Sequence, residues 1–78
     1  MNLDLRLKEV MSAVLGIPAE EIDESTSTDT VSKWDSMRSM SLVLSLEEEF
    51  NVQFTDAETI TLLSYRTIKQ TLVEKGVS

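Results

Sequence analysis

Apolar residues recur at helical spacing through most of this 78-residue chain. Near the N-terminus they fall at Leu3, Leu7, Val10, Met11 and Val14. Such spacing is typical of an amphipathic helix. Asn2 or Asp4 is suited to the start of that helix, and Gly16 followed by Pro18 is suited to its end. The first element is therefore predicted to be a helix that ends before Gly16.

A second helix is predicted from Ser36 to Phe50, and it is apolar on two sides. With residues placed about 100° apart around the axis, those expected to face the core are Ser39, Leu42, Val43, Leu46 and Phe50. A second arc, more than roughly 90° away, holds Met37, Met40 and Leu44, which we call the outer stripe. Glu47 and Glu48 flank this stripe. A core needs only one stripe, so the outer stripe either packs on another part of the fold, such as the long loop, or contacts other proteins.

The segment between these helices, residues 17–35, is rich in Ser, Thr, Asp and Glu. The apolar residues that are able to pin it to the core are Ile17, Ile22, Val31 and Trp34. Residues 19–22 are predicted to form a short helical turn. The acids of the segment are Glu20, Glu21, Asp23, Glu24 and Asp29. Because they lack the spacing of a calcium loop, we expect a solvated loop rather than a cation site.

The C-terminal part of the chain carries two further helix starts. Thr55 and Glu58 form the T-x-x-E pattern of a capping box, which predicts a short helix through about Thr61. Ser64 is suited to cap a last helix, which Gly76 terminates. The apolar residues that repeat at helical spacing in this last helix are Tyr65, Ile68 and Leu72.

Together these elements predict an all-α fold: a small four-helix bundle, made of three main helices and one short helix, with a long first loop. Residues 1–78 are short enough for a single domain. No apolar run approaches the roughly 18 residues of a membrane span, and the N-terminus lacks a signal-peptide pattern. We therefore expect a soluble, cytoplasmic protein without a membrane span.

The residue inventory argues against catalysis. The chain has no cysteine and no histidine, so it cannot form a disulfide, a thiolate metal site or a Ser-His or Cys-His nucleophile. We expect no catalytic residue, no metal site and no enzyme. Fourteen acidic against seven basic residues give a net charge of −7, which disfavours nucleic acid and anionic membranes as partners. The charge either favours protein partners with a basic patch or serves only solubility.

Ser36, at the predicted start of the second helix, has two interpretations. Serine and aspartate at helix starts are usually caps, and Asp35 or Ser36 is able to do this alone. A helix N-terminus also carries exposed amide donors and partial positive charge, which would stabilise a phosphodiester on Ser36. The outer stripe, edged by acids, suits enzymes with an apolar groove and a basic rim. A cysteine-free chain needs an attached thiol for any thioester chemistry.

At these residues the sequence resembles the acyl carrier protein family. The motif Asp35-Ser36-Met37 is similar to the Asp-Ser-Leu motif at the start of that family's second helix, and LSLEEEF follows at residues 44–50. The resemblance covers essentially the whole chain, from LGIPAEEI at residues 15–22 through the acidic loop to the closing short and long helices. The motif alone is weak, but length, charge and helix order make the match specific.

This resemblance implies a four-helix bundle in which Ser36 carries 4'-phosphopantetheine. A phosphopantetheinyl transferase would attach this arm from coenzyme A with magnesium, and its thiol would hold acyl or aminoacyl groups as thioesters. The other implied partners are acyl- or aminoacyl-loading ligases, synthases and transferases, and the carrier is expected to be a monomer. Asp35 would take part in recognition by the transferase. The remaining implied partner-recognition residues are Met37, Met40, Leu44, Glu47 and Glu48.

The sequence also departs from housekeeping fatty-acid carriers. Methionine replaces the leucine of the motif, Lys33-Trp34 replaces a Gly-x pair before it, and Arg38 and Ser41 stand where such carriers are more acidic. The start of the second helix is thus less negative, which favours a specialised pathway (polyketide, aminoacyl or cell-surface) over housekeeping fatty-acid synthesis. The alternative is a small acidic helical protein-interaction module in which Ser36 is only a helix cap.

Overall fold

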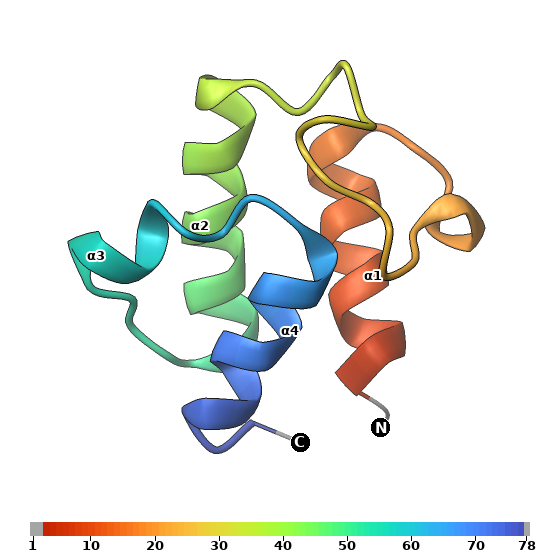
Figure 1. Cartoon of the computed structure of the whole chain (residues 1–78). Helices are drawn as coiled ribbons and strands as arrows, with labels where there is room; N and C mark the ends of the chain where they lie inside the picture. Colours follow the sequence, from red (N-terminus) through yellow and green to blue (C-terminus); the bar gives the residue numbers. More distant parts are fainter. Residues whose placement is uncertain (1–2, 78) are drawn as a thin grey trace.

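The computed structural model describes residues 3–77, which fold into four α-helices and one short 3₁₀ helix (Figure 1). Their bounds are α1 Leu3–Leu15, η1 Ala19–Glu21, α2 Ser36–Phe50, α3 Asp56–Thr59 and α4 Tyr65–Glu74. The predicted all-α bundle with a long first loop is confirmed. No helix within residues 3–77 is long and apolar enough to cross a membrane. The role predicted for Asn2 at the start of α1 lies outside the described residues.

Local sequence sets where the helices begin and end. Asp35 caps α2 and Ser64 caps α4, each through a side-chain oxygen that accepts a backbone N–H of the first turn. The predicted capping box of Thr55 and Glu58 is present at the start of α3. α1 is followed by Gly16, whose φ of +71° lies in the left-handed region that favours glycine. These boundaries were predictable because each depends on residues that are neighbours in the chain.

The end of α3 differs from the prediction, because the helix stops at Thr59 rather than at about Thr61. The hydroxyls of Thr59 and Thr61 donate to the backbone carbonyl oxygens of Asp56 and Glu58, at 2.8 and 2.7 Å. Side-chain hydrogen bonds of this kind compete with helical backbone pairing. The chain therefore leaves the helix early.

The core lies between α1, α2 and α4, whose buried stripes face one another. Its buried apolar residues are Leu3, Leu7, Met11, Leu15, Ile22, Trp34, Leu42, Leu46, Phe50, Leu62, Tyr65, Ile68 and Leu72. In Figure 1, α1 and α2 form two sides of the bundle, α4 lies between them, and α3 lies on the outer side of α2. The stripe of α2 that was predicted to face the core is the buried one, with Leu42 and Leu46 inaccessible and Val43 packed against them.

Distant contacts order the long loop between α1 and α2. The predicted anchors are buried in the core or packed against it: Ile17, Ile22, Val31 and Trp34. Two backbone hydrogen bonds also tie the loop to the start of α4. The Tyr65 N–H donates to the Thr26 carbonyl at 2.9 Å, and the Thr28 N–H donates to the Leu63 carbonyl at 3.0 Å. The acids of the loop are exposed, as predicted.

Polar side chains join the start of α1 to α4. The Tyr65 hydroxyl donates a hydrogen bond to the Asp4 carboxylate, and Lys69 Nζ lies 2.9 Å from Asp4 Oδ1. These contacts, first the one from Tyr65 and then the one from Lys69, hold the pKa of Asp4 below its ordinary value. Burial, together with the adjacent Asp4 carboxylate, raises the pKa of Tyr65, so the phenol stays neutral.

The same substitution, leucine to alanine, at Leu46 and at Leu44 compares how much each face of α2 contributes to stability. Leu46 is fully buried and Leu44 is 60% exposed. We expect Leu46→Ala to lower the free energy of unfolding by about 2–5 kcal/mol and Leu44→Ala by less than about 0.5 kcal/mol. Urea unfolding followed by circular dichroism measures both. Equal losses for the two leucines would contradict this assignment of faces.

Asp4 gives the stability a pH dependence. Because its folded-state pKa is lowered from an ordinary value of 3.8, its contacts stabilise the fold above that pH and are lost as the pH falls through the folded-state pKa. We expect Asp4→Asn to lower the melting temperature at neutral pH. The same substitution should also make the melting temperature fall less steeply as the pH is lowered. Some dependence remains, since the pKa values of Asp23 and Glu58 are also lowered. Melting curves over an acid series measure this, and an unchanged profile would contradict it.

Candidate functional site

Ser36 is the first residue of α2, and Asp35 is the N-cap of that helix. The Asp35 Oδ1 atom accepts the backbone N–H of Arg38 at 2.9 Å. The chain arrives extended at Asp35, with φ −102° and ψ −174°, and turns into the helix at Ser36. Of the two residues that the sequence offered as caps, Asp35 takes the role. The Ser36 side chain therefore does not cap this helix.

The Ser36 side chain is exposed, and its hydroxyl has no hydrogen-bond partner among residues 3–77. It stands at the N-terminus of a helix of 15 residues, where unpaired amide groups and the positive end of the helix dipole lie. No acidic residue occurs in the first turn of α2. Ser36 therefore offers an accessible hydroxyl in surroundings that stabilise the negative charge of a phosphodiester, so the residues present fit an attached phosphopantetheine.

The residues on either side of this serine are fixed to the end of α1. Trp34 is only 4% exposed and belongs to the core. Lys33 Nζ lies 3.4 Å from the Gly16 carbonyl oxygen, and an Arg38 guanidinium nitrogen lies 2.8 Å from that of Val14. Cations stabilise the carbonyl groups at a helix C-terminus. The buried Trp34 indole N–H has no acceptor within the described residues, so packing holds this ring.

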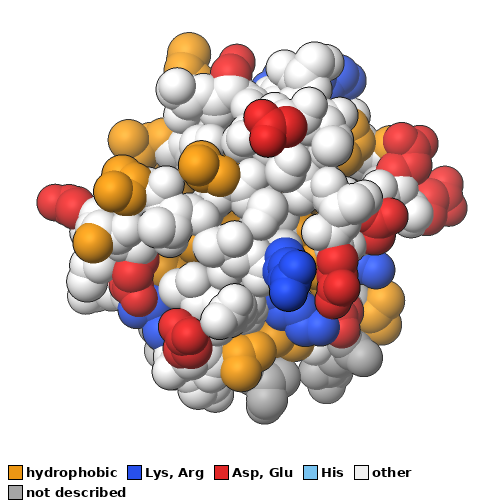
Figure 2. Space-filling model, in the orientation of Figure 1, with side chains coloured by type: hydrophobic (Ala, Val, Ile, Leu, Met, Phe, Trp, Pro, Cys, Tyr) orange, Lys and Arg blue, Asp and Glu red, His pale blue; other side chains and the backbone are white. Residues whose placement is uncertain are grey.

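The outer stripe is exposed, with Met37 at 80%, Met40 at 65% and Leu44 at 60%. It does not pack on the long loop, so the interpretation of this stripe as part of the fold is wrong. Ile60 and Leu63, just after α3, are also exposed. Sequence reasoning missed both because a four-residue helix is too short for its periodicity to indicate a face. Figure 2 shows apolar side chains gathered over the upper part of α2 and over α3.

A groove of about 360 Å³ lies beside Ser36, between α2 and the segment around α3. Its lining residues are Ser36, Ser39, Met40, Val43, Asp56, Thr59 and Leu63. An arm attached to Ser36 thus has an apolar hollow with a polar rim directly beside it. The residues contributed from around α3 were not predicted, because no pattern within α2 indicates which later segment packs beside it.

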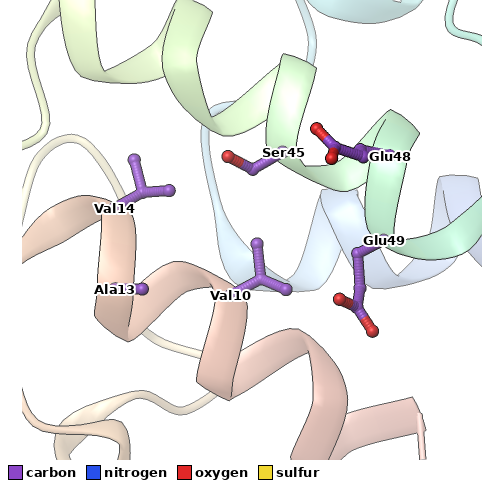
Figure 3. Close-up of a pocket in the computed structure, with 6 residues that line it drawn as sticks. All are labelled: Val10, Ala13, Val14, Ser45, Glu48 and Glu49. Atoms are coloured by element: carbon purple, nitrogen blue, oxygen red, sulfur yellow. The ribbon is translucent and has the colours of Figure 1, made fainter.

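The two acids that flank the outer stripe have different surroundings. Glu47 is half-buried, and its Oε2 atom accepts the backbone N–H of Phe54 at 2.9 Å, which fastens the loop after α2. Glu48 is exposed and lies at a second hollow between α1 and α2, across from Val10 and Val14 (Figure 3). Glu48 is therefore available to a partner, whereas one carboxylate oxygen of Glu47 is already occupied by the fold.

Comparison with known proteins gives the family. Residues 5–72 match the family described as "Phosphopantetheine attachment site", a range that includes Ser36 and all four α-helices apart from their outermost residues. An acyl carrier protein of Buchnera aphidicola subsp. Baizongia pistaciae (strain Bp) is 31% identical over 68 residues, which cover 86% of each chain. The chain therefore belongs to the acyl carrier protein family, whose members bear covalently attached 4'-phosphopantetheine and act as carriers rather than as catalysts.

Proposed function

We propose that Ser36 is the residue that bears 4'-phosphopantetheine. The observation that carries this proposal is the exposed, unpaired Ser36 hydroxyl at the start of α2, with the cap supplied by its neighbour Asp35. Because Asp35 holds the helix start, the Ser36 oxygen is available to react without loss of a structural contact. The Ser12 hydroxyl, in contrast, has a structural role, because it donates to the Ile17 carbonyl.

In the attachment reaction the Ser36 oxygen forms a bond to the pantetheine-side phosphorus of coenzyme A. The pyrophosphate linkage breaks, adenosine 3',5'-bisphosphate leaves, and the transferase takes the hydroxyl proton. The amide groups at the start of α2 would stabilise the charge of the resulting phosphodiester. Once attached, the arm supplies the thiol that this cysteine-free chain lacks and holds acyl or aminoacyl groups as thioesters.

We propose as partners the phosphopantetheinyl transferase, acyl- or aminoacyl-loading ligases, synthases and transferases. The residues proposed to contact them are Asp35, Met37, Met40, Leu44, Glu47 and Glu48. The exposure of the outer stripe supports its part in this surface. Exposed methionines fit partners of different shapes, and Glu48 favours a basic rim on the partner. We further propose one domain, residues 1–78, which acts as a monomer in the cytoplasm.

The pathway is proposed to be specialised rather than housekeeping fatty-acid synthesis. The support is the charge of the first half of α2, whose one charged side chain, Arg38, is directed to the Val14 carbonyl of α1. A partner that requires several acids in the first half of α2 finds none there. Polyketide, aminoacyl or cell-surface synthesis fits this surface better. Support of a complete fatty-acid elongation cycle at the rate of a housekeeping carrier would contradict this proposal.

Intact-protein mass tests the attachment site. The chain is incubated with coenzyme A, magnesium and a broad-specificity phosphopantetheinyl transferase, as wild type, Ser36→Ala and Ser41→Ala. Ser41 is an exposed serine on the same helix and serves as the matched control. We expect a gain of one phosphopantetheine in wild type and Ser41→Ala and no gain in Ser36→Ala. A gain in Ser36→Ala would contradict the site. No gain in wild type beside a working control carrier would favour the interaction-module alternative.

Met40→Glu tests the outer stripe, with Leu5→Glu as its control on α1. Both side chains are well exposed, at 65% and 58%, so neither substitution is expected to unfold the protein. We expect Met40→Glu to lower kcat/KM of the transferase for this carrier by at least about tenfold, or about 1.4 kcal/mol. Leu5→Glu should leave it within about twofold. Equal effects would show that the outer stripe is not the contact surface.

A further inference from the structure

The segment around α3 is held to the bundle differently from the other α-helices. α3 contributes no buried residue. Phe54 before it packs against the core, and Leu62 after it is 2% exposed. Residues 55–61 therefore lie between two apolar anchors without an apolar attachment of their own. Segments with few buried contacts are the ones that open most readily.

A single carboxylate organises the polar contacts of this segment. Glu58 Oε1 accepts the backbone N–H of Thr55 at 2.8 Å, as one half of the capping box. The same oxygen lies 2.8 Å from Nζ of Lys75, at the C-terminal end of α4. Lys75 Nζ also lies 5.4 Å from the centre of the Phe54 ring. The Lys75 and Glu58 side chains are only 21% and 31% exposed, so solvent screens this pair less than an ordinary surface pair.

The other side of this segment forms one wall of the groove beside Ser36. Asp56 and Thr59 of α3, with Leu63 after it, face Met40 and Val43 of α2 across that groove. Leu63 is held by the Thr28 N–H and by the buried Leu62 before it, so it is the part of this wall supplied by α3, Asp56 and Thr59, that depends on a contact made with α4. No buried side chain of α3 fixes it independently.

We infer that Lys75 is a positioning residue for the groove beside Ser36: its ion pair with Glu58 holds α3 in place and sets how far the groove opens. This inference rests on the proposed function only in assigning the groove to the arm on Ser36. When the pair is broken, residues 55–61 move away from α2 while Phe54 and Leu62 remain in the core. The pocket beside the attachment point is therefore adjustable without disruption of the bundle.

Arg6 is the matched control for Lys75, because each of these cations pairs with a glutamate and lies near a phenylalanine ring. Arg6 lies 4.6 Å from the centre of the Phe50 ring and pairs with Glu49 at 3.2 Å. It joins α1 to α2, which both bury apolar stripes in the core. Loss of Arg6 therefore removes an ion pair and a cation–aromatic contact without freeing a segment.

Amide hydrogen exchange on the unmodified protein tests the inference. We expect Lys75→Met to accelerate exchange in residues 55–61 by about tenfold or more, with the amides of α1, α2 and α4 little changed. Glu58→Gln keeps an oxygen for the Thr55 N–H and loses the charge, so it should act in the same direction. Lys75→Arg keeps the positive charge, so exchange in residues 55–61 should stay close to that of the wild type. Unchanged exchange in Lys75→Met, acceleration spread over the whole chain, or the same local effect from Arg6→Met would overturn the inference.

A probe at the attachment position tests the groove itself. Ser36→Cys introduces a unique thiol into this cysteine-free chain, and an environment-sensitive fluorophore is attached there. Adding Lys75→Met should shift its emission to the red as the groove opens, whereas adding Arg6→Met should not. Unchanged emission in Lys75→Met would contradict the inference. Neither measurement requires phosphopantetheine, so their failure is distinguishable from failure of Ser36 as the attachment site.

Discussion

The burial of one stripe of α2 against α1 and α4 sets the direction in which the exposed residues of this helix point. Leu42 and Leu46 are inaccessible, so the rotation of α2 about its own axis is set by the core. Successive residues of a helix are about 100° apart, and the directions of Ser36, the outer stripe and Glu48 follow from that rotation. The direction in which Ser36 and the outer stripe face solvent is therefore set by the buried residues of the same helix.

Features that depend on neighbouring residues were predictable from the sequence. The two faces of α2, the capping box at Thr55 and the caps before α2 and α4 needed only local spacing. Contacts between distant segments were not predictable. Examples are the hydrogen bond of Glu47 to the Phe54 N–H and the groove wall supplied by α3. Sequence spacing placed Glu47 beside the outer stripe correctly, but it gave no sign that a later backbone amide would occupy this carboxylate.

The end of α3 shows a different reason for failure. The capping box marked where the helix begins, but the hydroxyls of Thr59 and Thr61 decide where it stops by bonding to backbone carbonyl groups. Threonine is compatible with either outcome. Here the helix ends because the two hydroxyls bond to backbone carbonyl groups and because Leu62, which follows, is buried in the core. After this early end Ile60 and Leu63 are exposed, and Leu63 lines the groove beside Ser36 together with Met40 of α2.

Trp34 gives the site a property of its own. It is the single tryptophan of the chain, and its ring is buried immediately before the cap Asp35 and the exposed Ser36. Indole emission responds to the polarity and packing around the ring. The protein thus contains an intrinsic optical reporter two residues before Ser36, through which repacking of the segment that leads into α2 becomes visible without any label.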